Sequence, residues 1–196
     1  MKYRYNLNIT TPTTIKISGV FFCFVRVLDS KNELEYERIF YNPTRECLIN
    51  LPILGNYTLI VDNMVNIDYL GLIKNKPLFL PKFDRIPNDI NIKIENTQLE
   101  GSPARINIKK KVVLVNKKYH KLPKYIRRFI LAHEIGHLYY NSEEHSDLWA
   151  TNYLFSLGYN QSQCTNSLIN SLTDSSQKNE RVNFNFKNIC NHGNKR

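Results

Sequence analysis

The stretch that decides the fold of the second half of this chain is LAHEIGHLYYNSEEHSDLWATNYL, residues 131–154. It reads as two helical segments separated by Asn141 and Ser142. Asn141 is suited to leave the first helix in a left-handed conformation. Ser142 is a good N-cap for a second helix, and acidic residues follow it in the first turn. The stretch therefore predicts a helix, a short break and a second helix.

The first helical segment contains His133, Glu134 and His137, which together spell H-E-x-x-H. On a helix, two histidines four residues apart lie one turn apart on the same face, so both imidazoles can reach one zinc ion. Glu134 neighbours them and is placed to take a proton from a zinc-bound water that attacks a carbonyl. The motif therefore predicts a catalytic zinc site.

A catalytic zinc needs a third protein ligand and one open position. The second segment offers Glu143, Glu144, His145 and Asp147. Glu143 and Asp147 are four residues apart, on one face of the predicted helix. We predict that Glu143 is the third ligand and that Asp147 hydrogen-bonds to a ligand histidine and orients it. Asp147 or His145 as the third ligand remains the alternative.

The segments before the motif complete the predicted domain. Residues 104–116 predict one or two strands, and residues 122–140 have helical spacing, with Pro123 tolerated in the first turn. Gly136 lies where a small residue lets another backbone approach. An extended substrate is expected to pair with a strand at Ile106–Ile108 or at Val112–Val115.

The N-terminal half has a different pattern. Four runs are β-branched and aromatic or alternate in polarity, at residues 14–29, 33–41, 47–63 and 90–96, and Pro and Asn residues separate them. Such spacing is typical of a small β-sandwich. The predicted class is therefore α+β, with a β-sandwich-like docking domain at 1–97, a metallopeptidase domain at 98–172 and a polar, flexible tail at 173–196.

Composition narrows the partners and the compartment. The net charge is +10, and residues 101–132 carry ten Lys or Arg and no acidic residue. We interpret this stretch as a solvated basic face, since no nucleic-acid-binding signature accompanies it. The four cysteines have no CxxC spacing, the N-terminus has no signal-peptide pattern, and the apolar run Val20–Val25 is too short to span a bilayer. These features predict a cytoplasmic protein that has no membrane partner and is not secreted by a signal peptide.

Residues 127–163, RRFILAHEIGHLYYNSEEHSDLWATNYLFSLGYNQSQ, resemble the zincin metallopeptidases. The likeness is to the compact gluzincin-like type, in which HExGH is followed by ExxxD and an aromatic-Ala pair, here Trp149-Ala150. ImmA/IrrE-like peptidases and phage-encoded small zincins have such sequences. The resemblance implies Zn²⁺ on His133, His137 and Glu143, catalysis by Glu134, and a short sheet whose edge strand lies beside the active-site helix.

The function expected from these features is that of a zinc-dependent metalloprotease acting on a protein or peptide substrate. Tyr139, Tyr140 and His145 are the candidates for stabilising the oxyanion of its transition state. The alternative is a phage virion structural or assembly protein, packaged in or attached to the virion. In that case the zincin domain is a docking module or a slow maturation protease.

Overall fold

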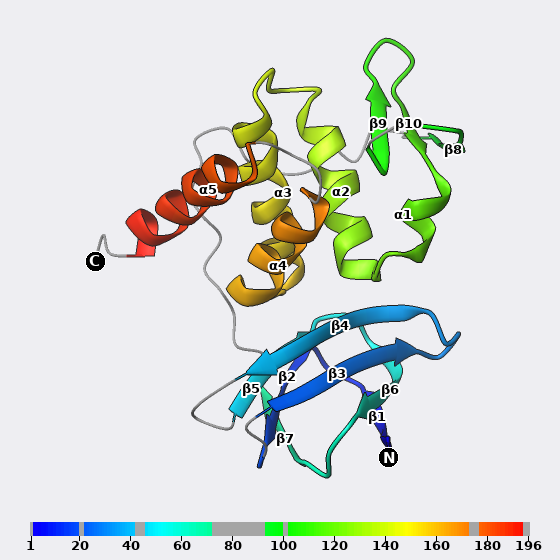
Figure 1. Ribbon diagram of the computed structural model, residues 1–196, viewed down its shortest axis with the longest axis vertical. Helices are drawn as coiled ribbons and strands as arrows, with labels where there is room; N and C mark the ends of the chain where they lie inside the picture. Colours follow the sequence, from blue (N-terminus) through cyan, green and yellow to red (C-terminus); the bar gives the residue numbers. More distant parts are fainter. Residues whose placement is uncertain are drawn as a thin grey trace. The chain divides into compact units, whose positions relative to one another are not determined.

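The computed structural model describes residues 2–19, 22–41, 46–71, 93–99, 102–172 and 177–193. The fold is α+β, as predicted, and the chain divides into two compact units (Figure 1). Of the described residues, the first unit takes those up to residue 71 together with 123–125 and 157–163, and the second unit takes the others.

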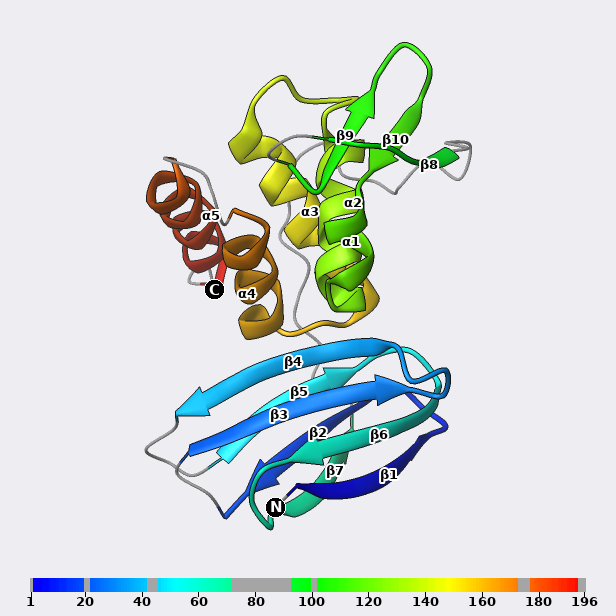
Figure 2. The same cartoon turned by 45° about the vertical axis from the view of Figure 1, so that its right-hand side comes forward.

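The first unit is built from two antiparallel sheets, which form two layers of strands (Figure 2). One sheet has the strand order β1-β6-β3-β4 and the other has the order β5-β2-β7. The strands are β1 (Tyr3–Ile9), β2 (Thr13–Ser18), β3 (Phe22–Asp29), β4 (Leu34–Tyr41), β5 (Glu46–Leu51), β6 (Gly55–Val61) and β7 (Asn66–Gly71). Sequence patterns had indicated all of them except β1 and β7.

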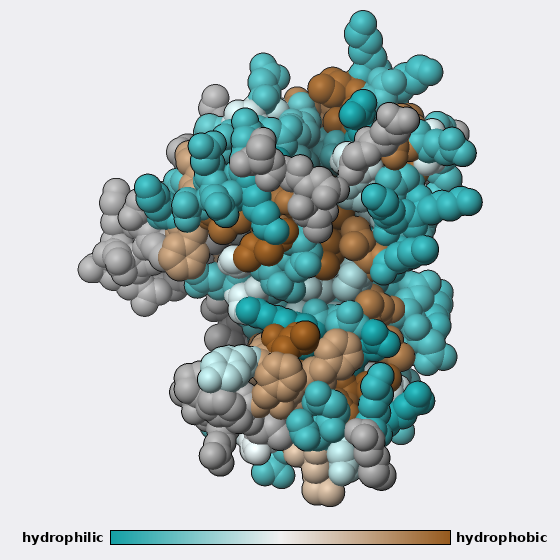
Figure 3. Space-filling model, viewed as in Figure 1, coloured by the Kyte–Doolittle hydropathy of each residue, from teal (hydrophilic) through white to brown (hydrophobic). Residues whose placement is uncertain are grey.

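Alternating side chains form the core of the first unit. In a strand, every second side chain points to the same face of the sheet. Ile15 and Ile17 of β2 are buried in this way, as are Val25 and Val27 of β3. On the opposite face of β3 and β4, Figure 3 shows hydrophobic side chains at the surface. Each sheet of this unit therefore turns an apolar face to the core, and the β3–β4 sheet also exposes some apolar surface.

The second unit contains a three-stranded sheet and most of the helical residues. The sheet has the order β8-β10-β9, with β10 parallel to β8 and antiparallel to β9. Its strands are β8 (Lys93–Asn96), β9 (Ala104–Asn107) and β10 (Val112–Val115). The helices of the chain are α1 (Lys117–Lys121), α2 (Lys124–Gly136), α3 (Glu143–Leu157), α4 (Gln161–Ser171) and α5 (Lys178–Gly193). Within the described residues, none of these helices has the length and hydrophobicity needed to cross a membrane.

The sheet corrects two predictions. Strand β10 is the central strand, with β8 and β9 paired to its two edges, so Val112–Val115 has no edge left for a substrate. Strand β8 belongs to this sheet, so the domain boundary predicted after residue 97 falls earlier in the chain. The alternating pattern of residues 90–96 identifies a strand but not its partner, because pairing is decided by tertiary contacts. Residues 72–92, which include the start of the predicted run 90–96, lie outside the described residues.

The predicted flexible tail is also corrected, because residues 178–193 form helix α5. Its buried side chains include Arg181 and Asn185, which are four residues apart and therefore lie on one face of the helix. Asn185 Nδ2 donates a hydrogen bond to Thr151 Oγ1 of α3 at 3.1 Å. Polar contacts of this kind help to dock α5, and the polar, Asn-rich composition that favoured a flexible tail does not reveal them.

Candidate metal centre

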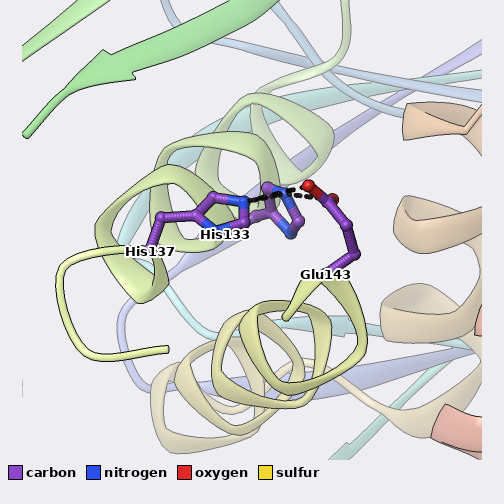
Figure 4. A group of neighbouring side chains, drawn as sticks. All are labelled: His133, His137 and Glu143. Atoms are coloured by element: carbon purple, nitrogen blue, oxygen red, sulfur yellow. Dashed lines mark hydrogen bonds and ion pairs between the residues drawn. The ribbon is translucent and has the colours of Figure 1, made fainter. Parts of the chain in front are cut away.

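Helix α2 carries the two histidines of the motif on one face. The backbone N–H of His137 donates to His133 O at 3.3 Å, so helical geometry continues through His137. The two rings lie with centroids 4.7 Å apart and nearly perpendicular planes, and their Nε2 atoms are 3.1 Å apart. The sequence spacing thus brings one nitrogen of each ring to the same point (Figure 4).

Helix α3 starts where the sequence predicted a restart. Ser142 is its N-cap, since Ser142 Oγ accepts a hydrogen bond from His145 N at 3.2 Å. Glu143 is therefore the first residue of the helix. The left-handed conformation predicted for Asn141 is wrong, because the described non-glycine residues with positive φ are Asn32 and Lys111. The chain makes this turn without a left-handed residue at that position.

Gly136 permits a close approach of α2 and α3. A Cβ atom at this position would lie 3.0 Å from Ser146 Cα and 3.3 Å from Ser146 O. Both distances are shorter than ordinary van der Waals contact with backbone atoms. The expectation that a small residue at 136 lets another backbone approach is confirmed, and that backbone belongs to α3.

Glu143 completes a cluster of three donor groups with His133 and His137 (Figure 4). Its Oε2 lies 3.3 Å from His133 Nε2, and its Oε1 lies 3.5 Å from His137 Nε2. Two nitrogen ligands of a tetrahedral zinc at about 2.05 Å would themselves be about 3.3 Å apart. The mutual spacing of the three side chains predicted as ligands is therefore compatible with one tetrahedral metal ion.

The Nδ1 atoms of both rings face partners outside this cluster. Asp147 Oδ1 lies 2.8 Å from His133 Nδ1, and the Asp147 side chain is fully buried. His137 Nδ1 lies 3.2 Å from Ser146 Oγ and 3.4 Å from Tyr140 O. The contact at His133 Nδ1 has the distance of an ion pair without the alignment of a hydrogen bond, whereas Ser146 Oγ lies at hydrogen-bonding distance from His137 Nδ1. Partners on the Nδ1 side favour ring orientations that turn the two Nε2 atoms toward each other. Asp147 stands where the sequence predicted an orienting carboxylate, whereas Ser146 was not foreseen.

The alternative third ligands lie elsewhere. His145 Nδ1 lies 2.6 Å from Ser142 Oγ, and its ring stacks on Tyr140 with centroids 5.8 Å apart. Both oxygens of Asp147 are engaged, one by His133 and Arg181 and the other by Arg181. The geometry thus favours Glu143 over either alternative.

Arg181 of α5 is a residue of this centre that the sequence did not indicate. Its Nε and Nη2 donate to the two oxygens of Asp147, each at 2.7 Å. Its Nη1 lies 3.0 Å from Glu143 Oε2. The only available signal is the helical spacing of Arg181 and Asn185 in a polar, Asn-rich segment, which does not distinguish a docked helix from a solvated one.

Glu134 faces strand β9 from α2. Its Oε2 accepts a hydrogen bond from the backbone N–H of Ile106 at 2.8 Å, and the residue is only 8% exposed. In an antiparallel pair, the backbone groups of alternate residues face the partner strand. Asn116 N–H donates to Pro103 O at 3.1 Å, so the backbone groups of residues 103, 105 and 107 face β10. Those of residues 104 and 106 face away from it. The contact to Glu134 is therefore made on the edge of β9 that faces away from β10.

A cavity of about 450 Å³ adjoins the cluster. Strand β9, the ends of α2 and α4, the start of α3 and one residue of α5 contribute to its lining, which includes Ala104, Ile106, His133, Glu134, His137, Tyr140, Glu143, Leu172 and Arg181. Of the three residues predicted to stabilise an oxyanion, Tyr140 lines this cavity and Tyr139 and His145 do not.

The surroundings of the two histidines shift their pKa values in opposite directions. Burial acts to lower the pKa of His133, but Asp147 and Glu143 outweigh it and raise this pKa to about 9. The contact with His133 in turn lowers the pKa of Glu143 to about 2. Burial and the charge on His133 lower the pKa of His137. Without a metal, the proton on His133 therefore balances the negative charge of the neighbouring carboxylates.

Burial has the opposite effect on Glu134, whose pKa it raises, although the charge of His133 partly offsets this. A raised carboxyl pKa moves Glu134 toward the range in which a general base also becomes a useful acid.

No protein-family profile, curated protein or solved structure matches this chain. The function is therefore inferred from the side chains and their geometry.

Proposed function

We propose that this chain is a zinc-dependent peptidase in which His133, His137 and Glu143 hold the metal and Glu134 is the general base. The observation that carries this proposal is the spacing of the three donor groups. Their closest atoms lie 3.1, 3.3 and 3.5 Å apart, on the wall of a cavity that also exposes Glu134.

The donor set fits zinc. Two imidazoles and one carboxylate are ligands that zinc accepts, and three protein ligands with an adjacent cavity leave one position open for chemistry. When bound, zinc would supply a Lewis acid that polarises a carbonyl oxygen and acidifies a water molecule. Asp147 and Ser146 contact the Nδ1 atoms of the two rings, on the side away from the cluster, so little reorganisation is needed for metal binding.

Glu134 would move the proton in peptide hydrolysis. Ile106 N–H holds one oxygen of its carboxylate, which leaves the other oxygen to accept a proton from the attacking water. The water oxygen forms a bond to the carbonyl carbon, and the C–N bond then breaks. The leaving amine takes the proton that Glu134 received, so the carboxylate is regenerated.

Strand β9 offers a docking edge for the substrate. It is the outer strand of its sheet among the described strands. On the edge that faces away from β10, Ile106 N–H donates to Glu134 and Ala104 O accepts from Ser102 Oγ, so Ala104 N–H and Ile106 O are the backbone groups left to pair with a peptide there. An extended peptide paired along this edge by β-augmentation would lie beside Glu134. Of the two docking segments predicted from sequence, the one at Ile106–Ile108 therefore remains as a proposal.

The alternative is an assembly protein in which any bound zinc is structural. Structural zinc sites usually have four protein ligands and no open position. Among the described residues the cluster has three such donors, and Glu134 lines the adjoining cavity. This arrangement favours hydrolysis over a purely structural role.

The test is peptide turnover by the zinc-loaded full chain on a mixed library of unstructured peptides, read by mass spectrometry. We expect cleavage that a chelator abolishes and added zinc restores. Glu134→Gln keeps the size of the side chain and is expected to bind zinc yet lose activity by at least about 100-fold. Cleavage by Glu134→Gln at the wild-type rate would refute the assigned role, and absence of cleavage by zinc-loaded wild type would favour the assembly protein.

A further inference from the structure

Arg181 joins helix α5 to both carboxylates that α3 turns toward the histidines. Its side chain is only 8% exposed, and all three of its nitrogen atoms have a carboxylate oxygen within 3.0 Å. Two of these contacts form a bidentate pair with Asp147, which is itself fully buried. This buried fork differs from a surface ion pair, because a guanidinium fixes the orientation of a carboxylate as well as its charge.

Three acidic groups lie near the histidines, and Arg181 holds two of them in place. Glu143 and Asp147 lie one turn apart on α3, and Glu134 lies on α2, so their negative charges repel one another. Arg181 holds Glu143 through one nitrogen and Asp147 through the other two. Asp147 then faces His133 Nδ1, and Glu143 faces the Nε2 atoms. The separation of the two carboxylates is thus set by one rigid, planar group.

We propose that Arg181 is a positioning residue for the metal centre, and that α5 is therefore part of the metal-binding unit. It acts through Asp147 on the ring of His133, and directly on the carboxylate of Glu143. This inference rests on the proposed function only in requiring that the cluster binds a metal ion.

Two effects of replacing Arg181 have opposite signs and must be separated. Loss of its positive charge alone would strengthen the attraction of the carboxylates for a divalent cation. Loss of its fork would release the carboxylates from their positions and weaken binding. Arg181→Lys keeps the charge but has a single nitrogen, which cannot span Asp147 and Glu143 in the same way. This variant therefore isolates positioning from charge.

The experiment measures zinc affinity of the full chain by competition with a chelating dye, and the visible spectrum of the Co²⁺-substituted protein. We expect Arg181→Lys to weaken zinc binding by about 10- to 100-fold and to change the Co²⁺ absorption bands, which report coordination geometry. Asn185→Ala is the matched control. It removes another buried contact between α3 and α5, to Thr151, without touching the cluster, and is expected to keep the wild-type affinity and spectrum.

Wild-type affinity together with a wild-type Co²⁺ spectrum in Arg181→Lys would overturn the inference while leaving the proposed function intact. An equal loss in Asn185→Ala would also overturn it, because the role of α5 would then be general packing. Failure of wild type to bind metal would refute the proposed metal centre itself. Circular dichroism shows whether Arg181→Lys is folded; if it is not, Arg181→Gln replaces it and the Co²⁺ spectrum alone decides.

Discussion

Metal binding is predicted to displace a proton from His133, so raising the pH should strengthen it. The perturbation is a change of pH from 7 to 8 at constant ionic strength. Asp147 and Glu143 raise the pKa of His133 to about 9, so at pH 7 this ring is almost fully protonated. Zinc needs the neutral imidazole, so each pH unit below about 9 lowers the apparent affinity about tenfold, or about 1.4 kcal/mol.

The other groups of the cluster contribute little to this dependence. The pKa of His137 is lowered, mainly by burial, and that of Glu143 is lowered to about 2, so neither needs to lose a proton near pH 7. Binding at pH 7 should therefore release about one proton. Isothermal titration calorimetry in buffers of different ionisation enthalpy counts this proton. Equal affinity at pH 7 and pH 8, with no proton released, would refute the reasoning.

The same pKa shift affects the stability of the metal-free chain with a definite sign. The pKa of His133 is raised above its unfolded value of about 6.5, so its stabilising effect is fully present below that pH and is lost as the pH rises through about 9. The loss amounts to about 3 kcal/mol in the free energy of unfolding. Denaturant unfolding at pH 6.5 and pH 9.5 measures it, and an unchanged free energy would contradict the charge balance described for the cluster.

Three substitutions extend the test to other parts of the centre. Gly136→Ala should lower the free energy of unfolding by about 1–3 kcal/mol, because its Cβ would push against Ser146. It should also weaken zinc binding, because α3 would be displaced. Unchanged denaturant unfolding together with unchanged dye competition would contradict this. Glu143→Gln should lower zinc affinity in the same dye assay, whereas Glu144→Gln should not, and equal effects would remove Glu143 as the third ligand. Asp147→Asn should weaken zinc binding about 10- to 100-fold, and a wild-type value would show that Asp147 does not orient His133.

Most local features of this centre were predictable from sequence, although the left-handed conformation expected at Asn141 was not found. His133 and His137 are four residues apart, so on a helix they lie on the same face. The N-cap at Ser142 depends on a single residue and its neighbours. The close approach of a second backbone at Gly136 was predictable for the same reason, because the sequence shows that this residue has no side chain. Each of these predictions relies on geometry within about one helical turn.

The long-range features were not predictable in this way. Arg181 meets Asp147 across 34 residues, and the polar sequence around it does not distinguish a docked helix from a solvated one. The contact of Ile106 N–H with Glu134 joins residues 28 apart, and the pairing of β8 with β10 moves a strand to the second unit. Such contacts depend on tertiary packing, which hydrophobic periodicity describes only for apolar faces.

The most direct test of the metal centre is the zinc content of the full chain after purification without chelators, for wild type, Glu134→Gln and His133→Ala. We expect about one zinc per chain in wild type and in Glu134→Gln, since Glu134 is not among the proposed ligands, and none in His133→Ala. Absence of zinc from wild type, or zinc retained in full by His133→Ala, would contradict it.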